Sequence, residues 1–178
     1  MFSYTNNLKS INLTNFNTSK VTSMAYLFQG CSSLESIDLS SITMLNSAMG
    51  SAFKSTFAYD IKLKNVNLSN LIPINVPNGT FSSTFKGCTA LTHNPINISA
   101  IESISDRAFQ ETFSNSGLSG TISFDSLRIA SSPNGQGKFG SCFARTPNLE
   151  EISFPVLEQG VNVGSASVPG RAYFSSIA

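Results

Sequence analysis

The sequence has little charge, no tryptophan, one histidine and three cysteines in 178 residues. Charged residues make up 12% of the chain and the net charge is +1, so no strong field exists to attract nucleic acid or an anionic membrane. No apolar run reaches the length of about 18 residues that a transmembrane helix needs. One histidine and scattered cysteines also fall short of the three or four converging ligands of a zinc site. The sequence therefore predicts no nucleic-acid partner, no membrane insertion in this segment and no cofactor.

Short uncharged polar residues take the place of the missing charge. Ser, Thr and Asn together form about a third of the chain, while hydrophobic residues still make up 40%. Disordered segments usually combine low hydrophobicity with high charge, which is the opposite balance. Such a composition favours turns and exposed sheet positions, and so a stacked or strand-rich fold.

A repeat with a leading phenylalanine runs through the whole chain. After each leading Phe come an aliphatic residue, an Ile-x-Leu type of triplet and a further apolar residue, as in Phe28, Leu34, Ile37, Leu39 and Ile42. The leading residues are Phe2, Phe28, Phe57, Phe85, Phe113 and Phe143, and an incomplete seventh coil begins near Tyr173. Regular self-similarity of this length is typical of a solenoid, in which each repeat forms one coil.

A second apolar column lies four residues before the leading Phe. It consists of Met24, Phe53, Phe81, Phe109 and Phe139. Residues four apart share one face of a helix, so each pair predicts one short helical turn that points inward.

The triplets predict short parallel strands, one in each coil. Apolar and polar residues alternate in Ile37-Asp38-Leu39 and Val66-Asn67-Leu68, which is the period of a strand. Strands in the same register about 28 residues apart cannot form hairpins and would stack about 4.8 Å apart. The sequence thus predicts a single solenoid domain over residues 1–178, part of a longer array, with a concave parallel sheet and an irregular convex side.

Several segments carry a family resemblance. The stretch from Leu8 through Phe28 to Leu34, the stretch from Phe85 to Leu91, and Ile104-Ser105-Asp106-Arg107-Ala108-Phe109 resemble the BspA-like leucine-rich repeat. The resemblance covers essentially the whole chain and is weaker from Gly117 on. It implies a curved right-handed solenoid, and a secreted or cell-surface protein that often acts in adhesion.

No residue pattern predicts catalysis. Cys31 and Cys88 occupy the same repeat position two coils apart, roughly 10 Å, which is too far for a disulfide, so we expect small buried residues there. Cys142 lies at another position, and His93 belongs to a surface loop. The Gly135-Gln136-Gly137-Lys138 stretch lacks the spacing of a phosphate-binding loop. The chain is therefore predicted not to be an enzyme.

The exposed strand positions form the candidate binding face. Two polar columns run along the predicted sheet, and their members are Asn12, Thr14, Asp38, Ser40, Asn67, Ser69, Asn97, Ser99, Ser123, Asp125 and Ser153. Concave solenoid faces often bind partners, although this one lacks the aromatic and Arg side chains of typical hot spots. One hypothesis is a non-enzymatic adhesion module that recognises a protein or glycan. The alternative is a spacer or assembly element of a larger fibre, appendage or virion, whose partners are neighbouring subunits.

Overall fold

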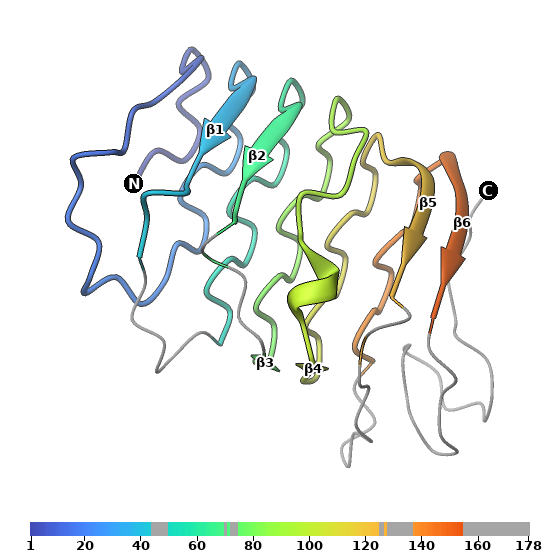
Figure 1. Ribbon diagram of the computed structural model, residues 1–178. Coiled ribbons are helices and arrows are strands. Elements are labelled where there is room, and N and C mark those ends of the chain that lie inside the picture. The colour runs from blue at the N-terminus through green and yellow to red at the C-terminus, as the bar shows by residue number, and fades with distance from the viewer. Residues whose placement is uncertain (44–49, 70, 72–74, 125–126, 128–136, 155–178) are drawn as a thin grey trace.

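The computed structural model describes residues 1–43, 50–69, 71, 75–124, 127 and 137–154. Within these residues the chain is strand-rich and mostly non-helical, with short parallel strand pairs. Successive turns of the chain lie side by side in one row, and the colour in Figure 1 passes along that row from blue to orange. Asp125 and Tyr173, which the sequence analysis singled out, lie outside the described residues.

Three two-stranded parallel sheets connect neighbouring repeats. The first pairs β1 (Ser36–Asp38) with β2 (Asn65–Asn67), the second β3 (Asn75–Val76) with β4 (Ser103–Ile104), and the third β5 (Ser119–Ser123) with β6 (Asn148–Ser153). Ile37 is in register with Val66, and Ile122 with Ile152. The predicted pairing of equivalent positions in adjacent repeats is confirmed in the first and third sheets.

The predicted strand of the fourth repeat is wrong. Ile96 and Ile98 are buried as expected, but Ile98 begins the 3₁₀ turn η2 (Ile98–Ala100), closed by a bond from the Ile101 N–H to the Ile98 carbonyl. This repeat has two extra residues around Pro95, which has no N–H to donate to a strand ladder. The strand pairs β1–β2 and β5–β6 therefore belong to separate sheets.

The predicted helical turns are also wrong, because the segments around each leading Phe are chains of tight turns. Phe53 and Phe57 donate their N–H groups to the carbonyls of Thr80 and Thr84 in the next repeat, at 3.0 Å each. Between them, Thr56 donates to the Phe53 carbonyl three residues back, at 3.1 Å. Along each segment, one amide donates to the neighbouring repeat and the next closes a local turn, in alternation. We call these segments the turn segments; in the third to fifth repeats they span residues 51–60, 79–88 and 107–116.

Left-handed residues explain why the turn segments imitate helical spacing. A positive φ recurs at every fourth residue: Ser51, Ser55 and Tyr59, then Gly79, Ser83 and Gly87, then Arg107, Glu111 and Asn115. A left-handed residue interrupts an α-helix. However, a conformation that repeats every four residues still points residues four apart in the same direction. The inward-facing pairs were predicted correctly for this reason, although the helix was not.

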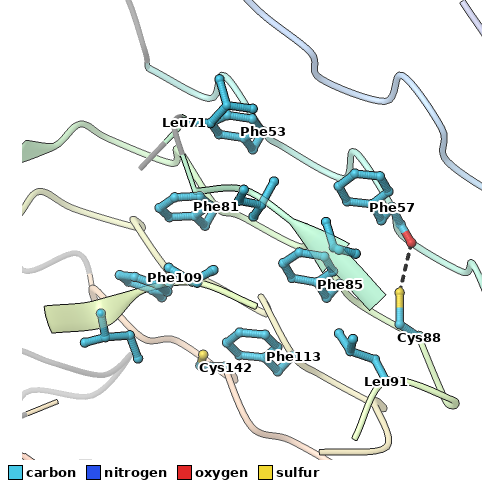
Figure 2. Packing of buried hydrophobic residues seen from close by; sticks show 14 of the residues in the cluster. Phe53, Phe57, Leu71, Phe81, Phe85, Cys88, Leu91, Phe109, Phe113 and Cys142 are labelled. Atoms are coloured by element: carbon cyan, nitrogen blue, oxygen red, sulfur yellow. Dashed lines mark hydrogen bonds between the residues drawn. The ribbon is translucent and has the colours of Figure 1, made fainter. Parts of the chain in front are cut away.

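Two phenylalanine columns form the core. The leading rings Phe28, Phe57, Phe85 and Phe113 stack with centroids 5.5–5.7 Å apart and interplanar angles of 1–6°. The second column continues through Phe53, Phe81, Phe109 and Phe139. Figure 2 shows the two columns side by side. Each such ring pair contributes about 0.5–1.5 kcal/mol beyond its buried area, so these ladders hold the repeats together.

The first repeat departs from the predicted pattern. Phe16, expected to point inward, is 50% exposed, because a turn from its N–H to the Leu13 carbonyl carries it outward. Phe2, Leu8 and Ile11 pack against the core but are only partly buried. The core is therefore less complete in the first repeat than in the repeats that follow it.

Candidate functional site

The predicted binding face lies on the surface. Asn12, Thr14, Asp38, Asn67, Ser69, Asn97, Ser99 and Ser123 are exposed, and Ser40 and Ser153 are partly exposed. Asp38 is in register with Asn67, and Ser123 with Ser153, so the strand pairs bring these residues together across repeats. Asn97 and Ser99 instead lie at the start of η2, outside a strand.

Local hydrogen bonds orient the polar columns. Asp38 Oδ1 accepts the N–H of Ser40 at 2.8 Å, and Asn67 Oδ1 accepts the N–H of Ser69 at 3.1 Å. The first repeat has the same arrangement between Asn12 and Thr14, at 2.9 Å. These Asx turns bend the chain at the end of each strand segment. The side chains are thus fixed relative to the backbone and present a regular polar row.

Among the described members of this row, Asp38 carries the negative charge. Its bonds from the Ser40 amide and hydroxyl lower the pKa of the Asp38 carboxyl below its ordinary value, with a further contribution from Asn67. Hydrogen bonds to the charged form favour ionisation. Asp38 is therefore an anion near neutral pH, and the other described members of the row present amides and hydroxyls.

A buried carboxyl lies beneath the surface, where the sequence analysis did not look for one. Asp60 follows its leading Phe by three residues, as do Cys31 and Cys88 in the adjacent repeats. All three residues are fully buried. The N–H of Cys31 donates to Asp60 Oδ1 at 2.7 Å, whereas Asp60 Oδ2 is buried without a hydrogen-bond partner among the described residues. The register of the repeat was the signal that could have revealed this residue.

Burial dominates the chemistry of this column. Loss of solvation raises the pKa of Asp60 to about 8, although the Cys31 and Gly30 amides act in the opposite direction. Burial, together with the nearby Asp60 charge, also raises the pKa of the Cys31 and Cys88 thiols. Thiols with a raised pKa are poor nucleophiles and poor metal ligands. The column therefore acts as part of the interior.

The cysteines are free and buried, as predicted. Cys31 Sγ donates to the Phe2 carbonyl and Cys88 Sγ to the Phe57 carbonyl, each at 3.0 Å; Figure 2 shows the second bond. Burial raises the pKa of Cys142 as well.

A buried threonine ladder is a second internal feature that the sequence analysis missed. Thr56, Thr84 and Thr112 each immediately precede a leading Phe and are fully buried. Their hydroxyls donate to the carbonyls of Met24, Phe53 and Phe81 at 2.7–2.9 Å. Buried hydroxyls need such partners, and here the partner is always the preceding repeat.

The remaining candidates stay apart from one another. His93 is exposed, in the loop where it was expected. Within the described ranges, no three His, Cys, Asp or Glu side chains are grouped so that they could hold a metal ion. Over the same part of the chain, the structure contains no helix with the length and hydrophobicity needed to cross a membrane.

Comparison with known proteins gives one similar solved structure and one family. The solved structure is the crystal structure of a leucine-rich repeat protein from Bacteroides ovatus, 21% identical, with a TM-score of 0.39. The match covers 83% of the present chain but 29% of the other, so the chain spans less than a third of that protein. A comparison with curated proteins gave no match. A family model described as "Mycoplasma protein of unknown function, DUF285" matches residues 1–98, more than half of the 178 residues. The chain therefore belongs to the DUF285 family.

Proposed function

We propose that this chain is a leucine-rich-repeat solenoid of the BspA-like type and serves as a non-enzymatic binding module. The polar strand face is its ligand surface, and its partner is a protein or glycan met outside the cell or at its surface. The whole of residues 1–178 forms one repeat domain in this proposal. The observation that carries it is the ordered row of Asn, Asp, Ser and Thr side chains on the surface of successive repeats.

The row is suited to recognition because its members are held in place before any ligand arrives. Asn12, Asp38 and Asn67 each accept a hydrogen bond from the residue two positions on. Groups that are already ordered lose little conformational entropy on binding. Asp38 and Asn67 lie opposite each other on β1 and β2, so one ligand can contact both.

A pair of matched variants tests this proposal. The intact chain is screened for binding to immobilised extracellular-matrix proteins and to a glycan array. For any protein or uncharged glycan found, we expect the double variant Asp38→Ala/Asn67→Ala to bind at least about tenfold more weakly, a loss of about 1.4 kcal/mol. Asn78→Ala is the control, because Asn78 is also exposed but lies next to a turn segment. Absence of any ligand, or equal binding by both variants, contradicts the proposal.

Assembly into a larger structure is the second candidate. It is favoured by the apolar side chains that the first repeat leaves accessible, with Met1 84% and Phe16 50% exposed. Exposed apolar patches often mark contact surfaces. Light scattering at rising concentration tests this candidate: end-to-end association that Phe16→Ser weakens supports it, and a monomer at all concentrations contradicts it.

A further inference from the structure

The turn segments carry a row of tyrosines on their outer surface. Tyr4, Tyr26 and Tyr59 are 64%, 43% and 48% exposed. All three have positive φ, at 59°, 59° and 68°, and so occupy the left-handed positions of the turns. The two strand-face columns contain no aromatic residue, so this row is a separate surface of the molecule.

Tyrosine and glycine alternate at one position of this row. Tyr4, Gly30, Tyr59 and Gly87 each follow a leading Phe by two residues in four successive repeats. A Cβ added to Gly30 would lie 2.5 Å from Tyr4 Cδ1, and one added to Gly87 would lie 2.7 Å from Tyr59 Cδ1. Each tyrosine ring therefore occupies the space that its glycine neighbour leaves empty. Packing against the next repeat restricts the rings while leaving about half of each side chain accessible.

The stack fixes the spacing of the two rings. Neighbouring repeats are about 4.8 Å apart where their backbones are hydrogen-bonded, so Tyr4 and Tyr59 lie about 10 Å apart along the row. A ligand that engages both rings through the same chemistry must itself repeat at a similar distance. An extended glycan with a disaccharide repeat presents an equivalent sugar face at each second residue, and apolar sugar faces pack well against aromatic rings.

Lysines provide the charge on this surface. The backbone N–H of Tyr26 donates to the carbonyl of Lys54 at 2.9 Å, and that of Tyr59 to the carbonyl of Lys86 at 2.7 Å, so the backbone of each of these tyrosines lies next to that of a lysine in the adjacent repeat. Lys86 forms an ion pair with Glu111 at 3.0 Å. Lys54 is exposed and takes no part in the ion pairs found among the described residues. The row is thus aromatic with a local positive charge, complementary to a carboxylate-bearing sugar.

We propose that the tyrosine row formed by Tyr4, Tyr26 and Tyr59, with Lys54, binds an extended glycan whose disaccharide repeat contains a uronic acid. The Tyr4 and Tyr59 rings pack against equivalent sugar faces one disaccharide apart, and the Lys54 ammonium pairs with a uronate carboxylate. This site specifies a chemical class of ligand and is distinct from the strand face.

Hyaluronan oligosaccharides of increasing length are the probe, with neutral chitohexaose as the comparison. The chain has no tryptophan, so tyrosine emission reports binding directly, and Tyr173→Phe removes the signal from outside the row. We expect a decasaccharide to bind more tightly than a tetrasaccharide, and chitohexaose to bind more weakly than either. Lys54→Gln should weaken binding several-fold and reduce its dependence on salt, because one ion contact is lost.

Variants that remove the tyrosine rings, compared with variants that keep an aromatic ring, distinguish a loss of binding from a loss of folding. We expect Tyr4→Ala/Tyr59→Ala to lose about tenfold in affinity per ring, whereas Tyr4→Phe/Tyr59→Phe keeps most of it. Calorimetry measures affinity in these variants, and circular dichroism confirms their fold. The strand-face variant Asp38→Ala/Asn67→Ala should bind hyaluronan as the parent does, so the two surfaces are tested separately. Lack of hyaluronan binding, equal binding of chitohexaose, or unchanged binding by the folded alanine variant overturns the proposal.

Discussion

The backbone N–H of Cys31 donates to Oδ1 of Asp60 at 2.7 Å, across two neighbouring repeats. The other oxygen of this carboxyl is buried without a partner among the described residues. Burying an ionised carboxylate without full hydrogen bonding is energetically unfavourable, so the neutral form of Asp60 is favoured. The groups facing it in the adjacent repeats are the Cys31 and Cys88 thiols, which are also neutral because burial raises their pKa.

The first prediction is that the protein becomes less stable as the pH rises from about 4 to about 8. Folded Asp60 has a pKa of about 8, whereas an ordinary aspartate has one of 3.8. Between these values the folded state holds a proton that the unfolded state has released, so the free energy of unfolding falls with pH. One proton corresponds to a slope of at most about 1.4 kcal/mol per pH unit. Urea denaturation at several pH values measures the slope.

Asp60→Asn and Asp38→Asn provide the matched controls. Asp60→Asn removes the titration and should flatten the profile in this window. Asp38 has a lowered pKa, so it contributes stability that is present above pH 4 and lost as the pH falls through its folded pKa. Asp38→Asn should therefore alter only the acid side. A slope that survives in Asp60→Asn would refute the assignment of a neutral carboxyl.

The second prediction concerns the phenylalanine columns. Phe85 is fully buried and stacks on both Phe57 and Phe113. Phe85→Ala should lower the free energy of unfolding by about 3–5 kcal/mol through lost burial and the cavity that remains. Phe16→Ala makes the same chemical change at a ring that is 50% exposed, and should cost much less. Similar losses in the two variants, measured by urea denaturation, would mean that the column does not hold the repeats together.

The third prediction separates backbone strain from the packing of a tyrosine ring. Gly87 and Gly120 have similar positive φ, 75° and 72°, but a Cβ at Gly87 meets the Tyr59 ring while one at Gly120 meets nothing within 4 Å. In both alanine variants the free energy of unfolding should fall by about 1–2 kcal/mol, because alanine must adopt a left-handed backbone conformation. Gly87→Ala should lose more, and the excess should disappear when Tyr59→Ala is the background. Equal losses for Gly87→Ala in both backgrounds would show that the ring does not pack against this glycine.

The fourth prediction tests the threonine ladder. Thr84 Oγ1 donates to the Phe53 carbonyl at 2.7 Å, and that carbonyl also accepts the Thr56 amide. Thr84→Val keeps the shape of the side chain but leaves the Phe53 carbonyl with one hydrogen-bond donor. The free energy of unfolding should therefore fall by about 1 kcal/mol. Thr84→Ser keeps the hydroxyl and removes a methyl group from the core. If the Thr84→Val variant is as stable as the parent protein in thermal unfolding, the Thr84 hydroxyl does not contribute to the stability of the stacked repeats.

Periodicity predicted most of the residues that face inward, although Phe16 is an exception. The leading and second columns were identified from sequence, and their rings stack in that order. The pairing of Ile37 with Val66 followed from the same register. The exposed polar positions followed from alternation within each strand, and most of them lie on the surface as expected.

Backbone conformation could not be predicted in the same way. A spacing of four residues is common to an α-helix and to turns with a left-handed residue at each fourth position. Ser and Glu rarely adopt a positive φ, so the left-handed conformation of Ser55 and Glu111 could not be predicted from their residue types. The pairing of β3 with β4 also went unpredicted, because Asn75–Val76 is too short to show alternation. The tyrosine row was missed because its members lie outside the predicted strands, and a binding face was expected only on those strands.

Ring-to-ring contacts measured in solution test the stacked repeat most directly. In a sample with labelled phenylalanines, nuclear Overhauser effects should connect Phe57 to Phe28 on one side and to Phe85 on the other, in agreement with centroid separations of 5.7 and 5.5 Å. The same experiment should connect Phe85 to Phe113. If Phe57 contacts neither Phe28 nor Phe85, the repeats do not stack in sequence order, and the surfaces proposed here do not exist.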